Sequence, residues 1–277
     1  MNRCLRTVAV IVSALLPAGS AVADDDRQSQ GRLKLMEQEV AQFTVHAPAG
    51  AAPASTRFAA KPVLRYSDPT RGLTEANVLM DATVWRLGEQ GRPRAIVMLE
   101  IYRSSASEGI LSFEFLSLSP DQFTMQHRTE PHILWEATES ALAMAPMPGA
   151  PEPAATAPAR LLQIRQFAKR FAVREKLLNG DLVECRLLTQ PIDRYQAADR
   201  QIADGAMFAF ANGTNPEVGL LFESDGKRWT YGLVRLTSAE ATVLLDDHEV
   251  VKFPISNSFQ SRKGSYVSNH HTVRLPQ

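Results

Sequence analysis

The stretch DATVWRLGEQGRPRAIVMLE at residues 81–100 has the same layout as the stretch DGAMFAFANGTNPEVGLLFE at residues 204–223. Each begins with an aspartate, continues with an apolar run, turns at a polar segment that contains proline, and ends with a second apolar run and a glutamate. Short apolar runs joined by a brief polar connection are typical of antiparallel hairpins. We therefore predict a β-hairpin in each stretch.

The two stretches align without a gap, although only three of the twenty aligned positions are identical. A helical stripe of apolar residues precedes each hairpin at the same spacing: Leu33, Met36, Val40 and Phe43 in one, and Leu161, Ile164, Ala168 and Phe171 in the other. We interpret this pattern as an internal duplication. The alternative is that any two antiparallel hairpins look alike at this level of detail.

The stripes predict two helices, over residues 33–44 and 160–178, among segments that otherwise read as strands. A helical stripe has to be buried, and a sheet has a face to cover, so a helix packed on a sheet is the simplest two-layer arrangement. The sequence therefore predicts an α+β fold, with antiparallel sheets covered by two main helices. In its duplicated form the fold would consist of two pseudo-equivalent α-β-β-β-β halves.

Composition divides the chain further. Residues 143–159 contain five prolines and seven alanines, which is typical of a linker. We expect the following segments: a signal peptide over 1–23, a disordered stretch over 24–32, a first α+β half over 33–142, the linker over 143–159, a second α+β half over 160–253, and a flexible tail over 254–277.

The first residues have the features of a secretory signal peptide. Arg3 and Arg6 precede an apolar core, and Ala21-Val22-Ala23 provides a cleavage site before Asp24. We therefore expect an exported protein, periplasmic or secreted, with no transmembrane segment after cleavage. The alternative is an uncleaved anchor at the membrane interface.

Charge and cysteine content exclude several classes of protein. Residues 24–277 contain 28 basic and 30 acidic residues, which gives no electrostatic basis for binding nucleic acid. Cys185 would be the one cysteine left after cleavage, so an internal disulfide is impossible. Its place in an alternating apolar stretch predicts a small buried side chain rather than a nucleophile.

No catalytic or cofactor motif is present in the sequence. The tetrapeptide SDGK at 224–227 is typical of a hairpin turn, and the motifs that accompany a Ser-x-x-Lys nucleophile are missing. The histidines lack the spacing of a zinc protease, and no calcium loop or phosphate loop occurs. We expect no catalytic residue, no metal and no cofactor.

Two Arg-Tyr pairs are weak candidates for ligand binding. Arg65-Tyr66 lies beside Asp68, and Arg194-Tyr195 follows Asp193. Guanidinium and phenol groups can line a ligand groove, and they can also brace a loop through an ion pair. We favour bracing, because no other polar residues converge there in the sequence.

Several stretches together resemble a family of exported bacterial proteins of unknown function: LRYSDPTRGL, DATVWRL, GRPRAIVMLEIY, RLLTQPIDRY and DGAMFAFANGTNPEVGLLFE. The resemblance implies a secreted globular protein and transfers no site residue.

We predict a non-enzymatic binding or structural module of the cell envelope, with an envelope polysaccharide or another envelope protein as its partner. The alternative is a hydrolase whose acid pair comes from distant strands. Its only candidate acids are Asp68, Asp81, Asp193 and Asp204.

Overall fold

The computed structural model describes residues 19–47, 49–51, 56–74, 77–177, 179–257, 259 and 261–276. Strands account for 51% of the chain and helices for 13%, and the sheet is curled into a half-barrel. The protein is therefore mostly β. The expectation of an α+β fold with two main helices covering the sheet is wrong, because the two helices are short and the two large sheets pack against each other.

All strand pairings within the three sheets are antiparallel, as the sequence predicts. The five-stranded sheet contains, in spatial order, β17 (Tyr266–Arg274), β5 (Glu108–Ser117), β4 (Ala95–Arg103), β3 (Asn77–Leu87) and β2 (Leu64–Thr74). The three-stranded sheet contains β1 (Phe43–His46), β6 (Phe123–His127) and β7 (Leu134–Ala137).

The largest sheet has nine strands. In spatial order it contains β16 (His248–Phe253), β15 (Glu240–Leu245), β9 (Phe171–Lys176), β10 (Leu182–Leu187), β12 (Ile202–Asn212), β13 (Asn215–Ser224), β14 (Trp229–Arg235) and β8 (Met144–Pro146). The ninth strand, β11 (Asp193–Ala197), also pairs with β12.

Both expected helices are present, but their bounds differ from the prediction. Helix α1 spans Gly19–Val40, so the stretch expected to be disordered is helical, and α2 spans Ala157–Ala168. The last residue of each apolar stripe, Phe43 or Phe171, begins a strand instead of ending the helix. In β9 the buried residues alternate, a strand period that overrides the helical spacing further upstream.

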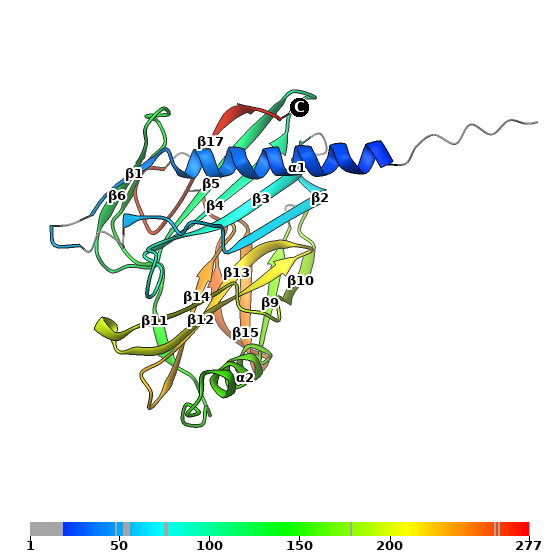
Figure 1. Ribbon diagram of the computed structural model, residues 1–277. Helices are drawn as coiled ribbons and strands as arrows, with labels where there is room; N and C mark the ends of the chain where they lie inside the picture. The colour runs from blue at the N-terminus through cyan, green and yellow to red at the C-terminus, as the bar shows by residue number, and fades with distance from the viewer. Residues whose placement is uncertain are drawn as a thin grey trace, which may run out of the picture.

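Among the described residues, three large hydrophobic clusters lie between successive layers, and a small fourth cluster contains Tyr195, Ala197 and Ile202. The first lies between α1, the three-stranded sheet and the outer face of the five-stranded sheet, and it includes Met36, Phe113 and Trp135. The second lies between the five- and nine-stranded sheets. The third lies between the nine-stranded sheet and α2, so the two helices flank opposite ends of the molecule (Figure 1).

This layering explains why the two quoted hairpins are apolar on both faces. In β4, Val97 and Leu99 face the outer core while Ile96 and Met98 face the core between the sheets. Antiparallel strands often have one polar face, and here a second sheet covers that face. Burial on both sides makes these hairpins the centre of the fold.

The segments expected to be a linker and a tail each contribute a strand to a sheet. Strand β8 lies inside the segment 143–159 and pairs with β14. Strand β17 lies inside the segment 254–277 and pairs with β5 along nine residues. Composition predicted a linker over 143–159 and a flexible tail over 254–277, and it did not indicate that β8 and β17 within them complete sheet edges.

Candidate functional site

A buried aspartate with two arginines lies on the first hairpin. Asp81, 3% exposed, accepts two hydrogen bonds from Arg65: Nε to Oδ1 at 2.9 Å and Nη2 to Oδ2 at 2.6 Å. Arg32 of α1 donates from Nε to Oδ2 at 3.2 Å. Arg65 Nη2 also donates to the carbonyl and the hydroxyl of Ser29, each at 2.7 Å. We call Arg32, Arg65 and Asp81 the first arginine cluster.

The second hairpin has a matching group. Asp204, 1% exposed, accepts a hydrogen bond from Arg160 Nε of α2 at 2.7 Å and another from Arg194 Nη2 of β11. We call these three residues the second arginine cluster. In both clusters a helix provides one arginine and the strand beside the aspartate provides the other. Each carboxylate is therefore held as the acceptor between two guanidinium groups.

The strand registers in the two places are the same. Arg65 lies opposite Thr83, two residues after Asp81, and Arg194 lies opposite Ala206, two residues after Asp204. A tyrosine follows each arginine and donates its hydroxyl hydrogen to the glutamate at the end of the quoted stretch: Tyr66 to Glu100 at 2.8 Å, and Tyr195 to Glu223 at 2.7 Å.

These contacts place four of the five ligand candidates inside fixed pairs. Arg65 and Arg194 form ion pairs, and the hydroxyl groups of Tyr66 and Tyr195 are hydrogen-bonded. Burial, together with the neighbouring glutamate, raises the pKa of each tyrosine well above its usual value. The side chains thus brace the strands, and any ligand has to meet what they leave exposed.

The fifth candidate, Asp68, is buried where β2 approaches the turn of the second hairpin. A side chain added at Gly213 would come within 2.6 Å of Asp68 Oδ2. Thr214 of the same turn donates its hydroxyl hydrogen to the Ser67 carbonyl. Asp68 therefore lies where β2 of the five-stranded sheet meets the β12–β13 turn of the nine-stranded sheet.

Asp193 is the remaining acid of the hydrolase alternative. Arg86 Nη1 donates to both of its carboxylate oxygens, at 2.9 and 2.8 Å. Burial raises the pKa of Asp193, and the Arg86 charge opposes that rise. Asp81, Asp193 and Asp204 thus each bind a different arginine partner.

The two clusters differ at one edge. Arg160 Nη1 donates to the carbonyl oxygens of Ala154 at 3.1 Å and Ala155 at 3.0 Å, so the segment before α2 covers the second cluster. The first cluster opens into a hollow of about 270 Å³. We call it the arginine hollow, and its lining residues are Ser29, Arg32, Arg65, Tyr66, Ser67, Met80 and Asp81.

A second hollow of about 350 Å³ lies beside the loop between β10 and β11. Its lining residues are Val63, Leu64, Arg186, Leu187, Leu188, Thr189, Gln190, Pro191 and Ile192. The one charged group there, Arg186, donates from Nε to the Gly213 carbonyl at 2.7 Å. The chemistry of this hollow is mostly apolar, whereas the arginine hollow has charged walls.

Sequence reasoning missed a group of acids between the two large sheets. Glu100 accepts hydrogen bonds from Tyr66 and, at 2.7 Å, from Tyr102, and Glu114 accepts one from Tyr266 at 2.6 Å. Burial raises the pKa of Glu114 well above its usual value. The available signal was a glutamate inside an otherwise apolar strand.

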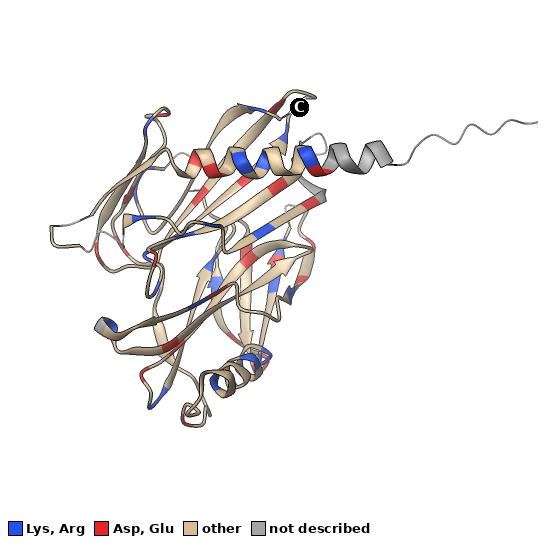
Figure 2. Ribbon diagram, in the orientation of Figure 1, with Lys and Arg blue, Asp and Glu red and all other residues tan. Residues whose placement is uncertain are grey.

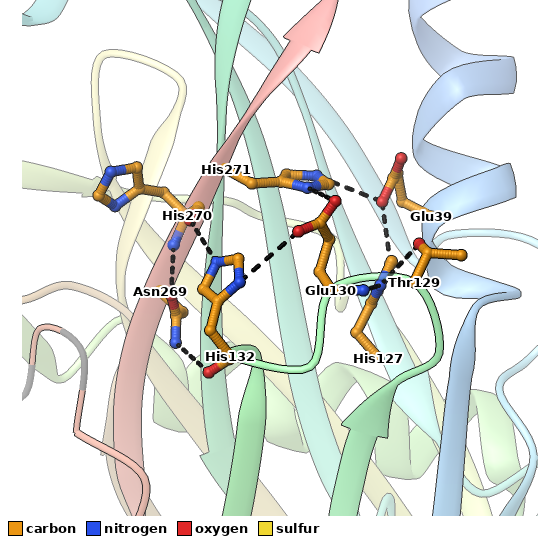
Figure 3. A network of polar contacts seen from close by, with 8 residues as sticks. All are labelled: Glu39, His127, Thr129, Glu130, His132, Asn269, His270 and His271. Atoms are coloured by element: carbon orange, nitrogen blue, oxygen red, sulfur yellow. Dashed lines mark hydrogen bonds and ion pairs between the residues drawn. The ribbon is translucent and has the colours of Figure 1, made fainter.

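Sequence reasoning also missed a histidine cluster that joins the C-terminal strand to α1 (Figure 3). Glu39 of α1 lies 3.0 Å from His127 Nε2 and 3.3 Å from His271 Nε2. The other ring nitrogen of His271 lies 3.5 Å from Glu130, which also contacts His132. These residues come from three separate segments, so no local pattern in the sequence reveals them.

The pKa values follow from this geometry. Burial would raise the pKa of Glu39, but hydrogen bonds from His127 and His271 and the charge of His271 outweigh it and lower the pKa to about 2. Burial lowers the pKa of His271, but Glu39 and Glu130 outweigh it and the net shift is upward. The His271 ring thus lies between two carboxylates, which favour its charged form.

The hydrogen bonds of His127 do not suit metal binding. Its Nδ1 accepts the backbone N–H of Glu130 at 3.1 Å, so Nε2 carries the proton and donates to Glu39. Across the part of the chain that the structure describes, no three His, Cys, Asp or Glu side chains are grouped to hold a metal ion.

Comparisons with known proteins add no family. No family model, no curated protein and no solved structure matches the chain. Within the described residues, neither helix combines the length and apolar character needed to cross a membrane. Basic and acidic residues are mixed along the described part of α1 and over both large sheets (Figure 2).

Proposed function

We propose that the chain is an exported, non-enzymatic binding module of the cell envelope and that its ligand contacts the arginine hollow. One observation carries the proposal. The two arginine clusters are built alike, and the first opens into a hollow where the second is covered by the chain's own carbonyl groups. Guanidinium groups held in place beside an open hollow offer planar, charged donors to an anionic ligand.

The surroundings of the candidate acids favour binding over hydrolysis. A hydrolase needs one carboxyl that holds a proton and a second that acts as a base in the same cleft. Asp81 and Asp204 each lie between two guanidinium groups, so both carboxylates are already engaged in ion pairs. Glu114 does have a raised pKa, but it lies between the sheets and lines neither hollow.

Export and duplication belong to the same proposal. A signal peptide over residues 1–23 accounts for the basic start, the apolar core and the Ala21-Val22-Ala23 cleavage site. Duplication accounts for the shared register of the hairpins β3–β4 and β12–β13. In a duplicated chain one copy of a site can keep a ligand while the other becomes structural, as the covered second cluster suggests.

Two assays with residues 24–277 test the proposal. One measures retention of the protein on isolated envelope polysaccharide, and the other measures its binding to a glycan array. We expect binding that weakens with salt, because the walls of the hollow are charged. Hydrolysis of the bound polysaccharide, or no retention on any envelope fraction, would contradict it.

A further inference from the structure

The helix arginines of the two clusters differ in how many acceptors surround them among the described residues. Arg160 uses Nε for Asp204 and Nη1 for two carbonyl oxygens, so three acceptors surround its guanidinium. Among the described residues, Asp81 is the only hydrogen-bond acceptor of Arg32, whose side chain is 11% exposed and lines the arginine hollow. A guanidinium has five N–H donors, so oxygen acceptors from a ligand fit the open edge of Arg32.

We propose that the arginine hollow binds the carboxylate of an acidic sugar, a uronate unit of an envelope polysaccharide. This inference rests on the proposed function and names its ligand. The walls hold two guanidinium groups and one carboxylate, which leaves a net formal charge of +1. A single carboxylate neutralises that charge, and its two oxygens match the planar donors of an arginine.

The other walls favour a sugar over a peptide terminus. Ser29 and Ser67 carry hydroxyl groups suited to sugar hydroxyls, and Met80 is the one aliphatic side chain in the lining. The hydroxyl of Tyr66 is directed to Glu100. A peptide terminus would need an apolar pocket for its last side chain, and the lining offers little such surface.

The site is organised before the ligand arrives. Arg65 is held by Asp81 and by both oxygens of Ser29, and Arg32 is held by Asp81. Side chains already fixed in their bound positions lose little conformational freedom on binding. The size of the hollow, about 270 Å³, corresponds to one sugar unit rather than a chain.

The test measures binding of four probes to residues 24–277 by NMR titration: glucuronate, glucose, inorganic phosphate and triglycine. We expect glucuronate to bind most tightly and glucose not to bind measurably. Arg32→Gln should weaken glucuronate about tenfold or more, because it removes a charged hydrogen-bond donor. Ser67→Glu, which leaves both ion pairs of Asp81 intact, should abolish binding by repulsion.

Arg160→Gln is the matched control, because it breaks the equivalent ion pair in the covered cluster. We expect it to lower the melting temperature about as much as Arg32→Gln and to leave glucuronate binding unchanged. Equal loss of binding in both variants would show a general structural effect and overturn the inference. Tighter binding of phosphate or triglycine, or no binding of glucuronate, would overturn it as well.

The polysaccharide assay separates this inference from the function on which it rests. If Arg32→Gln and Ser67→Glu still bind envelope polysaccharide as the unaltered chain does, the ligand lies elsewhere and only the inference fails. If the unaltered chain binds glucuronate but no envelope fraction, the hollow is assigned correctly and the envelope function fails.

Discussion

Polar residues on the central strands act as braces between segments that are distant in sequence. Asp81 and Asp204 each join a helix to a strand. Burying a carboxylate is costly, and two guanidinium groups with aligned donors compensate for that cost. Removing one partner would leave an uncompensated buried charge, so these aspartates are expected to tolerate little change.

Gly205 is a position where the second hairpin depends on the absence of a side chain. A Cβ atom there would lie 2.2 Å from the Tyr195 ring, which crosses the strand to reach Glu223. Gly205→Ala would displace the ring, and we expect the free energy of unfolding to fall by about 1–3 kcal/mol. Urea unfolding measures this change, with Ala203→Ser at an exposed position of the same strand as the control.

The first hairpin has Ala82 where the second has Gly205, and Tyr66 crosses it in the same register. Ala82→Gly should therefore not relieve strain and should lower stability slightly, through chain entropy. A Gly205→Ala variant as stable as the unaltered chain would show that Tyr195 is free to move, against the close contact described above.

Among the elements, strand β17 is held by the histidine cluster as well as by the sheet. His271 of β17 contacts Glu39 of α1 and Glu130 of the β6–β7 loop, and His127 and His270 are its titratable neighbours. The charged ring is favoured in the folded state. The attachment of β17 is therefore expected to depend on pH.

The sign of this dependence follows from the two shifts. The pKa of His271 is raised, so its contribution to stability is complete below its usual value of 6.5 and is lost as pH rises through the raised value. The pKa of Glu39 is lowered from 4.5 to about 2, so its contribution is present above 4.5 and is lost as pH falls toward 2. Their joint contribution is largest between these limits.

His271→Gln should reduce the fall in stability above about pH 6.5, because Gln does not titrate. Urea unfolding at several pH values measures it, and hydrogen exchange of β17 amides shows whether the effect is local. His46→Gln, at an exposed position of β1, is the control. An unchanged pH profile in His271→Gln would contradict the assigned contact with Glu39.

Sequence patterns located the elements better than their roles. The hairpins β3–β4 and β12–β13 follow from their apolar runs, because a strand buried on both faces has a strong local signature. The arginine hollow could not be predicted from the sequence, although Arg65 and Tyr66 were candidate ligand-binding residues. Its remaining walls, including Arg32 and Met80, come from other segments, and only the fold brings them together.

At the scale of the whole molecule, each half of the chain supplies an edge strand to the sheet that the other half mainly forms. Strand β8 comes from the chain before α2 and completes the edge beside β14, whereas β17 comes from the C-terminal end and completes the edge beside β5. Contacts at the turns are also reciprocal. Arg92, in the first hairpin's turn, binds Glu223, and Thr214 of the second turn binds Ser67.

Composition could not reveal this exchange. Prolines and alanines around β8 are typical of a linker, and the polar residues of β17 are typical of a frayed end. Both segments gain order from edges that neither could form alone. The wrong α+β prediction has the same origin, because the pattern of one segment does not show that a second sheet covers it.

Deleting residues 265–277 should unfold the protein rather than trim a flexible tail. The deletion removes Val267 and Val273 from the outer core and takes the Tyr266 hydroxyl from Glu114. Exposed apolar surface and an unpaired buried carboxyl both destabilise the fold. Circular dichroism and thermal melting measure the loss, with residues 24–277 as the reference. A cooperative melt close to that reference would show that β17 contributes little.

Splitting the chain at Gly149 tests the exchange itself. Gly149 is exposed and has a positive φ of 65°, so a break there disturbs a turn and no sheet. The fragment 24–149 keeps β8 but lacks β17, and the fragment 150–277 keeps β17 but lacks β8. Each fragment therefore lacks an edge strand that the other carries, and we expect neither to fold alone.

Mixed or co-expressed, the two fragments should form a one-to-one complex with the melting behaviour of a single cooperative unit, measurable by size-exclusion chromatography and calorimetry. A fragment that melts cooperatively by itself would contradict this mutual dependence, because it would show that one sheet is stable without the strand supplied by the other half.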